Sequence, residues 1–143
     1  MTAPDSLQSL GWRPFFSAQV VGGEAFPARV LNVHRDRLEI AYEGGHGRIE
    51  LSTGAVAMGI TVGDWVMIDS ERSRVTRRLD RLGLFQRRGA GTAGAIQLIA
   101  ANVDTLFIVT SANRDFNVAR LERYLAIAHD AGAFPVIIVT KAD

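Results

Sequence analysis

The stretch Val103–Asp143, "VDTLFIVTSANRDFNVARLERYLAIAHDAGAFPVIIVTKAD", decides the fold class. It begins with a nearly continuous apolar run, 103–109, of the kind found in parallel strands that are buried on both faces. Asn117 can cap a helix in which apolar side chains recur at spacings of three and four residues. Gly132 fits a left-handed helix end, and Pro135 prevents the helix from continuing. A second apolar run follows, so the stretch predicts a strand–helix–strand unit with parallel strands.

Such a unit is too small to be a domain. Two parallel strands with one covering helix leave one sheet face and one sheet edge exposed. We therefore expect further strands, and we expect the chain to be the N-terminal part of a longer protein.

The region that precedes this unit has a different pattern. Between Phe26 and Leu82, short runs of alternating apolar and polar residues are separated by glycine-rich turns, with no long helix. Five such strands predict a small closed or nearly closed barrel. An OB-fold, the five-stranded barrel that binds oligonucleotides, is the favoured form, and an SH3-like barrel is the alternative. The strand sequences are "PARVLNVHR" (27–35), "RLEIAYE" (37–43), "RIEL" (48–51), "VGDWVMID" (62–69) and "RVTRRLDR" (74–81).

The predicted fold class is therefore β followed by α/β. Residues 1–25 form an N-terminal arm, and 26–82 form the OB-like RNA-binding barrel. An Arg/Gly-rich linker, 83–101, leads to the α/β unit at 102–143.

Basic residues are concentrated at the end of the barrel. The chain has a net charge of +1, but 72–91 holds seven arginines and one aspartate, a net charge of +6. Such a block indicates a polyanionic partner, and nucleic acid fits the predicted barrel. A solvated strand face with an adjoining linker is the structural alternative. The predicted nucleic-acid-binding residues are Arg72, Arg74, Arg77, Arg78, Arg81, Arg87 and Arg88.

A glycine-rich segment, "GAGTAG" (Gly89–Gly94), matches the dinucleotide fingerprint G-x-G-x-x-G. That fingerprint requires an apolar strand before its first glycine, whereas Arg87 and Arg88 precede this one. The same glycines fit a phosphate-binding loop, but Ala95 stands where the lysine is needed. We interpret the segment as a flexible connection.

The tetrapeptide "TKAD", Thr140 to Asp143, follows the second apolar run directly. In α/β sheets, ligands bind outside the carboxyl ends of the strands, where this tetrapeptide lies. The Asp143 carboxylate can accept hydrogen bonds from guanine N1–H and its exocyclic amine, whereas adenine has no amine there. Lys141, the only lysine beside fifteen arginines, can lay its aliphatic stem along the base. The structural alternative is an ordinary strand-exit loop with Lys141 solvated.

The remaining composition narrows the class of protein. Cysteine is absent, which excludes disulfides, thiol catalysis and cysteine-ligated zinc in this chain and favours a cytoplasmic protein. The three histidines have no metal-ligand spacing, so no metal site is predicted. No apolar run is long enough to span a membrane.

Two stretches resemble the ribosome small-subunit-dependent GTPase A family (RsgA, also called YjeQ). The sequence "ANVDTLFIVTSANRDFNVARLERYLAIAHDAGAFPVIIVTKAD" (101–143) is similar to the segment that leads into the guanine-specificity motif of that family. The sequence "LGWRPFFSAQ" (10–19), followed by a small basic barrel, resembles its N-terminal region. The chain departs from the commonest form of the motif at Thr140, where asparagine is usual. Because a hydroxyl replaces only part of an amide, affinity is affected more than base choice.

The resemblance implies a circularly permuted GTPase domain, in which the guanine motif precedes the phosphate-binding loop, the switch regions and the DxxG motif. It implies GTP or GDP with Mg²⁺ as ligands, bound through Thr140, Lys141 and Asp143 on the guanine side. It also implies a zinc-binding domain C-terminal to the GTPase domain. The partner would be the small ribosomal subunit with its 16S-type rRNA, and GTP hydrolysis would be coupled to late subunit maturation.

The residues present predict that this chain alone does not hydrolyse GTP, because it holds no catalytic residue, phosphate loop or Mg²⁺ ligand. A stand-alone OB-type nucleic-acid-binding module without enzymatic activity is the alternative function. A dinucleotide-dependent enzyme built on "GAGTAG" is the third possibility.

Overall fold

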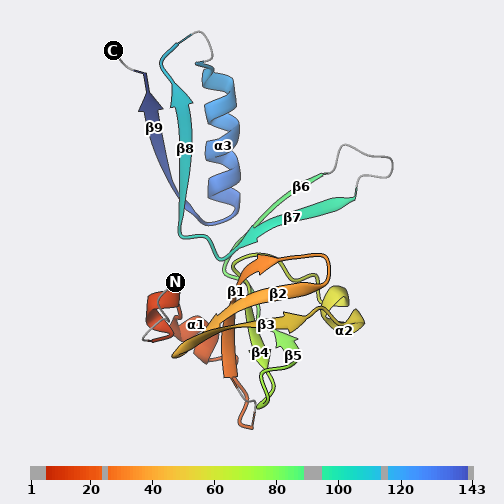
Figure 1. Cartoon of the computed structure of the whole chain (residues 1–143). Helices are drawn as coiled ribbons and strands as arrows, with labels where there is room; N and C mark the ends of the chain where they lie inside the picture. The colour runs from red at the N-terminus through yellow and green to blue at the C-terminus, as the bar shows by residue number, and fades with distance from the viewer. Residues whose placement is uncertain (1–5, 24–25, 89–94, 114–115, 142–143) are drawn as a thin grey trace.

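The computed structural model describes residues 6–23, 26–88, 95–113 and 116–141. A curved five-stranded sheet forms the lower part of the molecule in Figure 1, and a strand–helix–strand unit forms the upper part. A two-stranded hairpin projects from the region between them.

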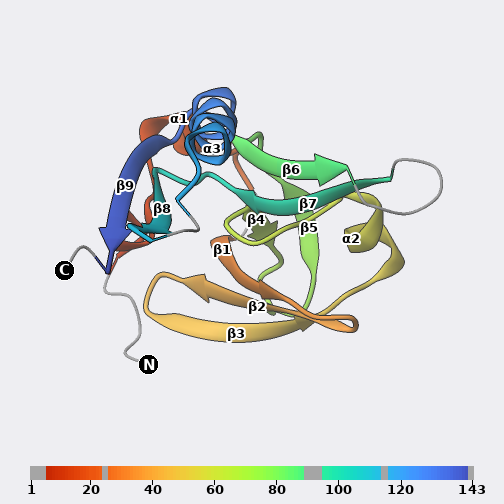
Figure 2. The same cartoon turned by 90° about the horizontal axis from the view of Figure 1, so that it is seen from above.

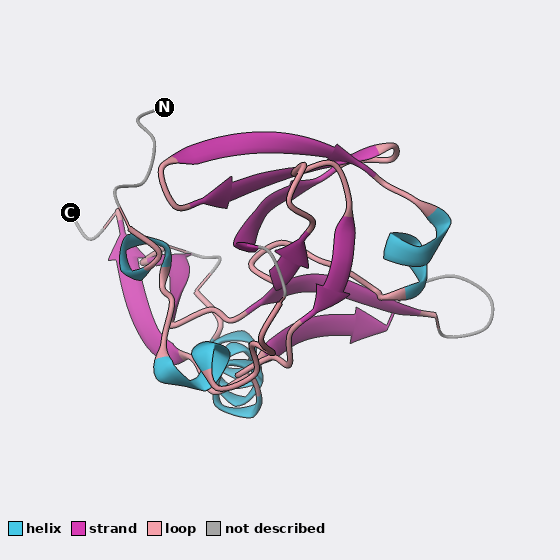
Figure 3. Cartoon of the chain, turned by 90° about the horizontal axis from the view of Figure 1, so that it is seen from below, coloured by secondary structure: helices cyan, strands magenta, loops and turns pink. Residues whose placement is uncertain are grey.

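The five-stranded sheet contains the five strands that the sequence predicts. Neighbouring strands pair antiparallel in the order β3-β2-β1-β4-β5. Figure 3 shows the strands curling around a common interior. No pairing joins β3 to β5 among the residues that the structure describes, so the ladder is open there. The strands are β1 (Phe26–Val33), β2 (Arg37–Tyr42), β3 (Gly45–Glu50), β4 (Trp65–Ile68) and β5 (Val75–Arg78).

Alternation along the strands builds the interior of this sheet. In β2, Leu38 and Ile40 are buried in the core, whereas the intervening Glu39 is only partly covered. Strand β4 is buried on both faces, because its alternate residues enter two different clusters. The inner cluster comprises Ala28, Val30, Leu38, Ile40, Ile49, Val66, Ile68 and Val75.

The N-terminal segment covers the other face of β4. It holds the short helices η1 (Gln8–Leu10) and α1 (Pro14–Ser17). Phe16 is buried against Trp65, with ring centroids 5.7 Å apart, and Trp12 meets the same indole edge-on at 4.6 Å. The predicted arm is therefore part of a hydrophobic core.

A short helix, α2 (Thr53–Ala57), connects β3 to β4 and was not predicted. Its N-cap is Ser52, whose Oγ accepts a hydrogen bond from the Ala55 N–H at 3.2 Å. The helix has little more than one turn, so its sequence carries no apolar period.

The predicted linker contains regular structure. Strands β6 (Leu84–Arg88) and β7 (Ile96–Ala101) pair antiparallel, so both sides of "GAGTAG" belong to a hairpin. The segment Gly89–Gly94 itself lies outside the described residues. The base of β7 is fastened to the five-stranded sheet, because the Ala101 N–H donates to Val62 O at 2.7 Å. The residues on either side of the glycines thus form paired strands within the predicted Arg/Gly-rich linker.

The strand–helix–strand unit is confirmed. Strands β8 (Thr105–Ser111) and β9 (Phe134–Thr140) are parallel, and α3 (Val118–Asp130) packs on one side of them. The Asn117 side chain caps α3 by accepting from the Arg120 N–H at 2.9 Å. Gly132 has a φ of +68° and donates its N–H to His129 O, as a left-handed helix end requires.

One face of this unit is open. Ile108 and Thr110 are buried beneath α3, but Phe107 and Val109, which point the other way, are each 64% exposed. The expectation of burial on both faces is therefore wrong for β8 in this chain, and the expectation of an exposed face is confirmed. A two-stranded sheet with one helix cannot cover both of its faces.

Asn102 joins the two parts where β7 passes into β8. It has a φ of +55° and is 7% exposed. Its side chain accepts from the Leu82 N–H at 2.8 Å and donates to Gly63 O at 3.0 Å. Its backbone carbonyl accepts from Arg29 Nη2 at 2.9 Å, and its N–H donates to Gly83 O at 2.9 Å. Seen from above in Figure 2, α3 and the hairpin lie next to one another over this junction.

Candidate functional site

The carboxyl ends of β8 and β9 lie together at one edge of the upper unit. Ser111 pairs with Thr140 in the parallel register, so both polar residues mark the same level of the sheet. The Ala112 N–H donates to Thr140 O at 2.9 Å, and Thr140 Oγ1 donates to Thr110 O at 3.2 Å. Thr140 thus uses its hydroxyl to join the two strands at the edge where α/β sheets bind ligands.

Lys141, the residue after Thr140, has an unusual backbone conformation. Its φ is +53°, in the left-handed region that side chains other than glycine, asparagine and aspartate rarely adopt. Its side chain is exposed beyond the strand end. Strained conformations of this kind cluster at ligand-binding sites, where the local geometry is part of the function. Asp143, the predicted guanine acceptor, lies outside the described residues.

Three arginines of the basic block form contacts within the fold. Arg81 binds both carboxylate oxygens of Asp64, through Nε and Nη2 at 2.7 Å each, and also Gly59 O at 2.7 Å. Asp64 is fully buried, and the Arg81 side chain is 14% exposed. Arg78 donates to Met58 O at 3.1 Å, and Arg77 donates to Gln19 O at 2.8 Å. These side chains hold connecting segments against the sheet.

Other arginines of the block lie at the surface. Arg72 has a φ of +56°, and its guanidinium lies over the rings of Tyr42 at 4.5 Å and Phe26 at 5.1 Å. Arg74 is 72% exposed beside Asp69. Arg87 is exposed on the hairpin and donates to the Gln97 side chain at 2.9 Å. Arg88 is the last residue of β6. The six arginines whose side chains the structure describes are thus divided between contacts within the fold (Arg77, Arg78, Arg81) and exposed surface (Arg72, Arg74, Arg87).

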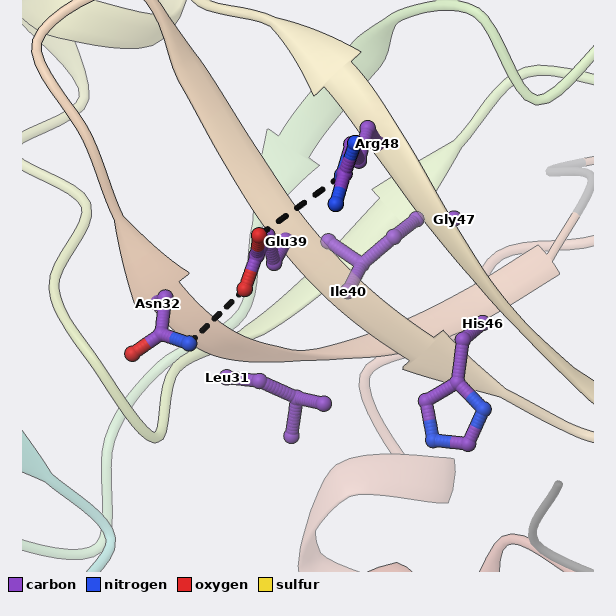
Figure 4. Close-up of a pocket in the computed structure, with 7 residues that line it drawn as sticks. All are labelled: Leu31, Asn32, Glu39, Ile40, His46, Gly47 and Arg48. Atoms are coloured by element: carbon purple, nitrogen blue, oxygen red, sulfur yellow. Dashed lines mark hydrogen bonds and ion pairs between the residues drawn. The ribbon is translucent and has the colours of Figure 1, made fainter. Parts of the chain in front are cut away.

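A separate cavity of about 530 Å³ lies on the outer side of β1, β2 and β3. Glu39 is central in Figure 4, with Asn32 and Arg48 on either side. Asn32 Nδ2 donates to Glu39 Oε2 at 2.8 Å, and Arg48 Nε lies 3.6 Å from Oε1. The hydrogen bond from Asn32 is the main cause that lowers the pKa of Glu39, so this carboxylate is ionised at neutral pH.

Arg29 occupies the inner part of the junction near Asn102. Its Nη1 donates to Leu10 O at 2.6 Å, and its guanidinium lies 5.6 Å from the Trp65 ring centroid. Burial lowers the pKa of this guanidinium. On the same side of the junction, Arg13 forms an ion pair with Asp104. The N-terminal segment therefore bonds to the start of the upper unit.

In the ranges 6–23, 26–88, 95–113 and 116–141, no three His, Cys, Asp or Glu side chains come close enough to hold a metal ion. None of the helices that the structure describes is long and apolar enough to cross a membrane.

Comparison with known proteins identifies the family. The model of the RsgA GTPase family matches residues 78–143. A protein of Mesorhizobium japonicum named small ribosomal subunit biogenesis GTPase RsgA is 50% identical over 140 residues, which are 96% of this chain and 40% of the relative. The chain belongs to the RsgA GTPase family.

A second RsgA protein, small ribosomal subunit biogenesis GTPase RsgA 2 of Vibrio parahaemolyticus, is 45% identical over 146 residues, covering 100% of this chain and 40% of the relative. The chain thus spans about two-fifths of the length of these RsgA relatives. The crystal structure of YjeQ from Thermotoga maritima superposes with a TM-score of 0.61 at 18% identity, over 82% of this chain and 42% of that chain. This similarity shows a shared fold, which is mostly β with a few helices.

Sequence reasoning identified the RsgA family but missed the residues that position its two parts. Asp64, Arg29 and Asn102 were not singled out, because their partners lie far away in the chain. Gly63, which precedes Asp64, was the one local sequence feature that could have indicated a tightly packed turn at this position. It has a φ of +85°, and a Cβ there would lie 2.1 Å from Ala101 O.

Proposed function

We propose that this chain supplies the guanine-recognition strand end and the RNA-binding part of a GTPase that acts on the small ribosomal subunit. The observation that carries the proposal is the shared edge at Ser111 and Thr140, followed by Lys141 in its left-handed conformation. Because ligands bind at this edge of α/β sheets, the strand-end position of Lys141 supports a base site there, and Asp143 follows two residues later in the sequence motif.

The rest of the nucleotide site belongs to the part of the relatives that this chain does not span. The resemblance assigns the phosphate-binding loop and the Mg²⁺ ligands to that part, in a circularly permuted order. The open face of β8, with Phe107 and Val109 exposed, supports further strands or helices against this unit. A stand-alone nucleic-acid-binding module gives no reason for this open apolar face.

The five-stranded sheet supports an RNA-binding role. Its order β3-β2-β1-β4-β5 fits an OB-type barrel with the ladder open between β3 and β5. We assign residues 26–82 to this domain, with the 1–25 segment packed on it, and 102–143 to the start of the GTPase domain. The hairpin within 83–101 connects the two. The exposed members of the basic block, Arg72, Arg74 and Arg87, are the proposed phosphate contacts.

Nucleotide analogues test the guanine site in the full-length protein. Inosine nucleotides lack the exocyclic amine, so losing one hydrogen bond to a carboxylate costs about 1.5–3 kcal/mol, roughly 10- to 150-fold in affinity. The variant Asp143→Ala is expected to lose the difference between GDP and IDP. Asp130→Ala, at the exposed end of α3, is the matched control. Equal GDP and IDP affinity in the unaltered protein refutes the assignment, as does a preference that survives Asp143→Ala.

Salt titration tests the RNA part. Each phosphate contact to single-stranded RNA contributes about 0.7 to the slope of log K against log salt. Changing Arg72, Arg74 and Arg87 together to glutamine is expected to lower the slope by about 2. The control is Arg123→Gln at an exposed position on α3, which removes a single charge outside the proposed interface and should leave the slope unchanged. An unchanged slope in the triple variant removes the basic surface from the proposed interface.

A further inference from the structure

The cavity on the outer side of β1, β2 and β3 belongs neither to the strand-end site nor to the basic block. It opens where β1 has an irregularity between Val30 and Asn32. The register leaves Leu31 as an additional residue opposite β2, and Leu31 lines the cavity. The volume, about 530 Å³, lies within the range of small-molecule sites. The irregularity in β1 therefore accompanies a hollow on this side of the sheet.

Polar groups line one side of this hollow. Glu39 is 28% exposed and Arg48 is 72% exposed, and the two residues face each other across β2 and β3. Glu39 Oε2 accepts from Asn32, whereas Oε1 lies 3.4 Å from His34 Nε2 and 3.6 Å from Arg48 Nε. An ionised carboxylate has about four lone-pair sites, so Oε1 retains capacity for a ligand's donors. An acceptor and a cationic donor thus stand next to each other.

The other side of the hollow is formed by an aliphatic side chain and an imidazole ring. Figure 4 shows Leu31 and His46 on the side away from Arg48, with the imidazole ring bordering the space. Gly47 lies between His46 and Arg48 and brings only backbone to the wall. Imidazole and guanidinium planes are surfaces on which single-stranded RNA bases stack.

The only common RNA base whose pairing edge carries two adjacent donors and one acceptor is guanine. Its N1–H and exocyclic amine match the Glu39 carboxylate, and its O6 matches an N–H of Arg48. Uracil, cytosine and adenine each offer the carboxylate at most one donor position on that edge. We propose that this cavity binds an unpaired guanine of single-stranded RNA, with Glu39 and Arg48 reading its edge and His46 lying against its plane.

The inference rests on the proposed RNA-binding role of the five-stranded sheet. An RNA strand, and not a free nucleotide, is the expected occupant, because Arg35 and Arg37 lie at the exposed end of the same strands and can meet neighbouring phosphates. Free guanine mononucleotide has no such neighbours.

The test uses the full chain and single-stranded RNAs with a 5′-hydroxyl. Each is a uridine decamer with one central guanine, inosine, adenine or uracil, and binding is followed by fluorescence anisotropy. One well-placed contact pair discriminates by about 5- to 150-fold, so we expect the guanine decamer to bind at least five times more tightly than the other three. Because inosine keeps O6 and N1–H but lacks the exocyclic amine, the difference between guanine and inosine measures the contribution of the amine to binding. Guanosine monophosphate is added as competitor to distinguish the free nucleotide.

Matched variants locate the contact. Glu39→Gln and Arg48→Gln are expected to abolish the guanine preference while leaving uridine binding within about twofold. Glu50→Gln on β3 and Arg123→Gln on α3 make the same charge changes on exposed residues outside the cavity and should retain the preference. Thermal melting of all four variants reports whether each one is folded.

Each outcome supports or overturns the proposed guanine pocket. A guanine preference removed by Glu39→Gln and Arg48→Gln alone supports the pocket. RNA binding without guanine preference, or a preference unaffected by both variants, overturns the pocket and leaves the RNA-binding role intact. Displacement of the RNA by equimolar guanosine monophosphate overturns the assignment to an RNA strand. No binding of any decamer overturns the pocket and the proposed RNA-binding role together.

Discussion

Replacing Asp64 by alanine is expected to destabilise the five-stranded sheet strongly. Asp64 accepts two hydrogen bonds from Arg81 and one from the Thr61 N–H, all at 2.7 Å. Its side chain is fully buried. The substitution removes two of the three hydrogen bonds that Arg81 makes to described residues, leaving the one to Gly59 O, and it leaves the Thr61 N–H without its acceptor.

The expected cost follows from this geometry. Breaking a buried ion pair by removing one partner costs about 3–5 kcal/mol. Arg81 is 14% exposed and retains some access to water, which favours the lower end, about 3 kcal/mol. At about 2–4 °C per kcal/mol for a chain of this size, the melting temperature should fall by roughly 10 °C.

Urea unfolding measured by circular dichroism tests the value. Asp36→Ala is the matched control, because Asp36 is 73% exposed in its pair with Arg37 and should change stability by less than about 1 kcal/mol. Replacing both partners, Asp64→Leu with Arg81→Met, should cost less than Asp64→Ala alone, because no charge is then left buried. If Asp64→Ala costs less than about 1 kcal/mol, or if the double variant costs more, the pair does not act as described.

Two further predictions concern the junction and a turn. Gly83→Ala should lower the free energy of unfolding by about 1–3 kcal/mol, because the new Cβ would lie 1.9 Å from the Ala131 carbonyl oxygen. The control Gly22→Ala places its Cβ within 4 Å of no atom and should be nearly neutral. Equal urea midpoints for the two variants would contradict this prediction. The backbone N–H of Ser73 is the main cause that lowers the pKa of Asp69 in the β4–β5 turn. The stabilisation from Asp69 is therefore present above its ordinary pKa, about 3.8, and is lost as the pH falls through the folded pKa. Asp69→Asn should flatten the acid side of the stability–pH curve, and unchanged acid dependence would refute the assignment.

The parts of the fold that were predictable depend on short-range patterns. Alternation identified β2 through Leu38 and Ile40, and spacing with caps identified α3 through Asn117 and Gly132. Both patterns reflect contacts that a local element makes with a core on one side. The strand-end position of Thr140 and Lys141 followed from the same reasoning.

The parts that were not predictable depend on distant partners. The Arg81–Asp64 pair spans 17 residues and the Arg29–Asn102 bond spans 73, so no local spacing reveals either one. A basic sequence block therefore looks uniform, although Arg81 is enclosed and Arg74 is exposed. The β6–β7 hairpin did have a signal in the sequence, since two short runs flank a glycine-rich segment, but this region was interpreted as a flexible linker.

Asn102 fixes the start of the connection between the five-stranded sheet and the upper unit. Its four hydrogen bonds, to Arg29, Gly63, Leu82 and Gly83, all reach the sheet side of the junction, so a movement that lifts Asn102 from the sheet must break them, at about 1 kcal/mol each. The upper unit consequently starts from a fixed point on the sheet, and any hinge between the two parts must lie in the residues that follow Asn102.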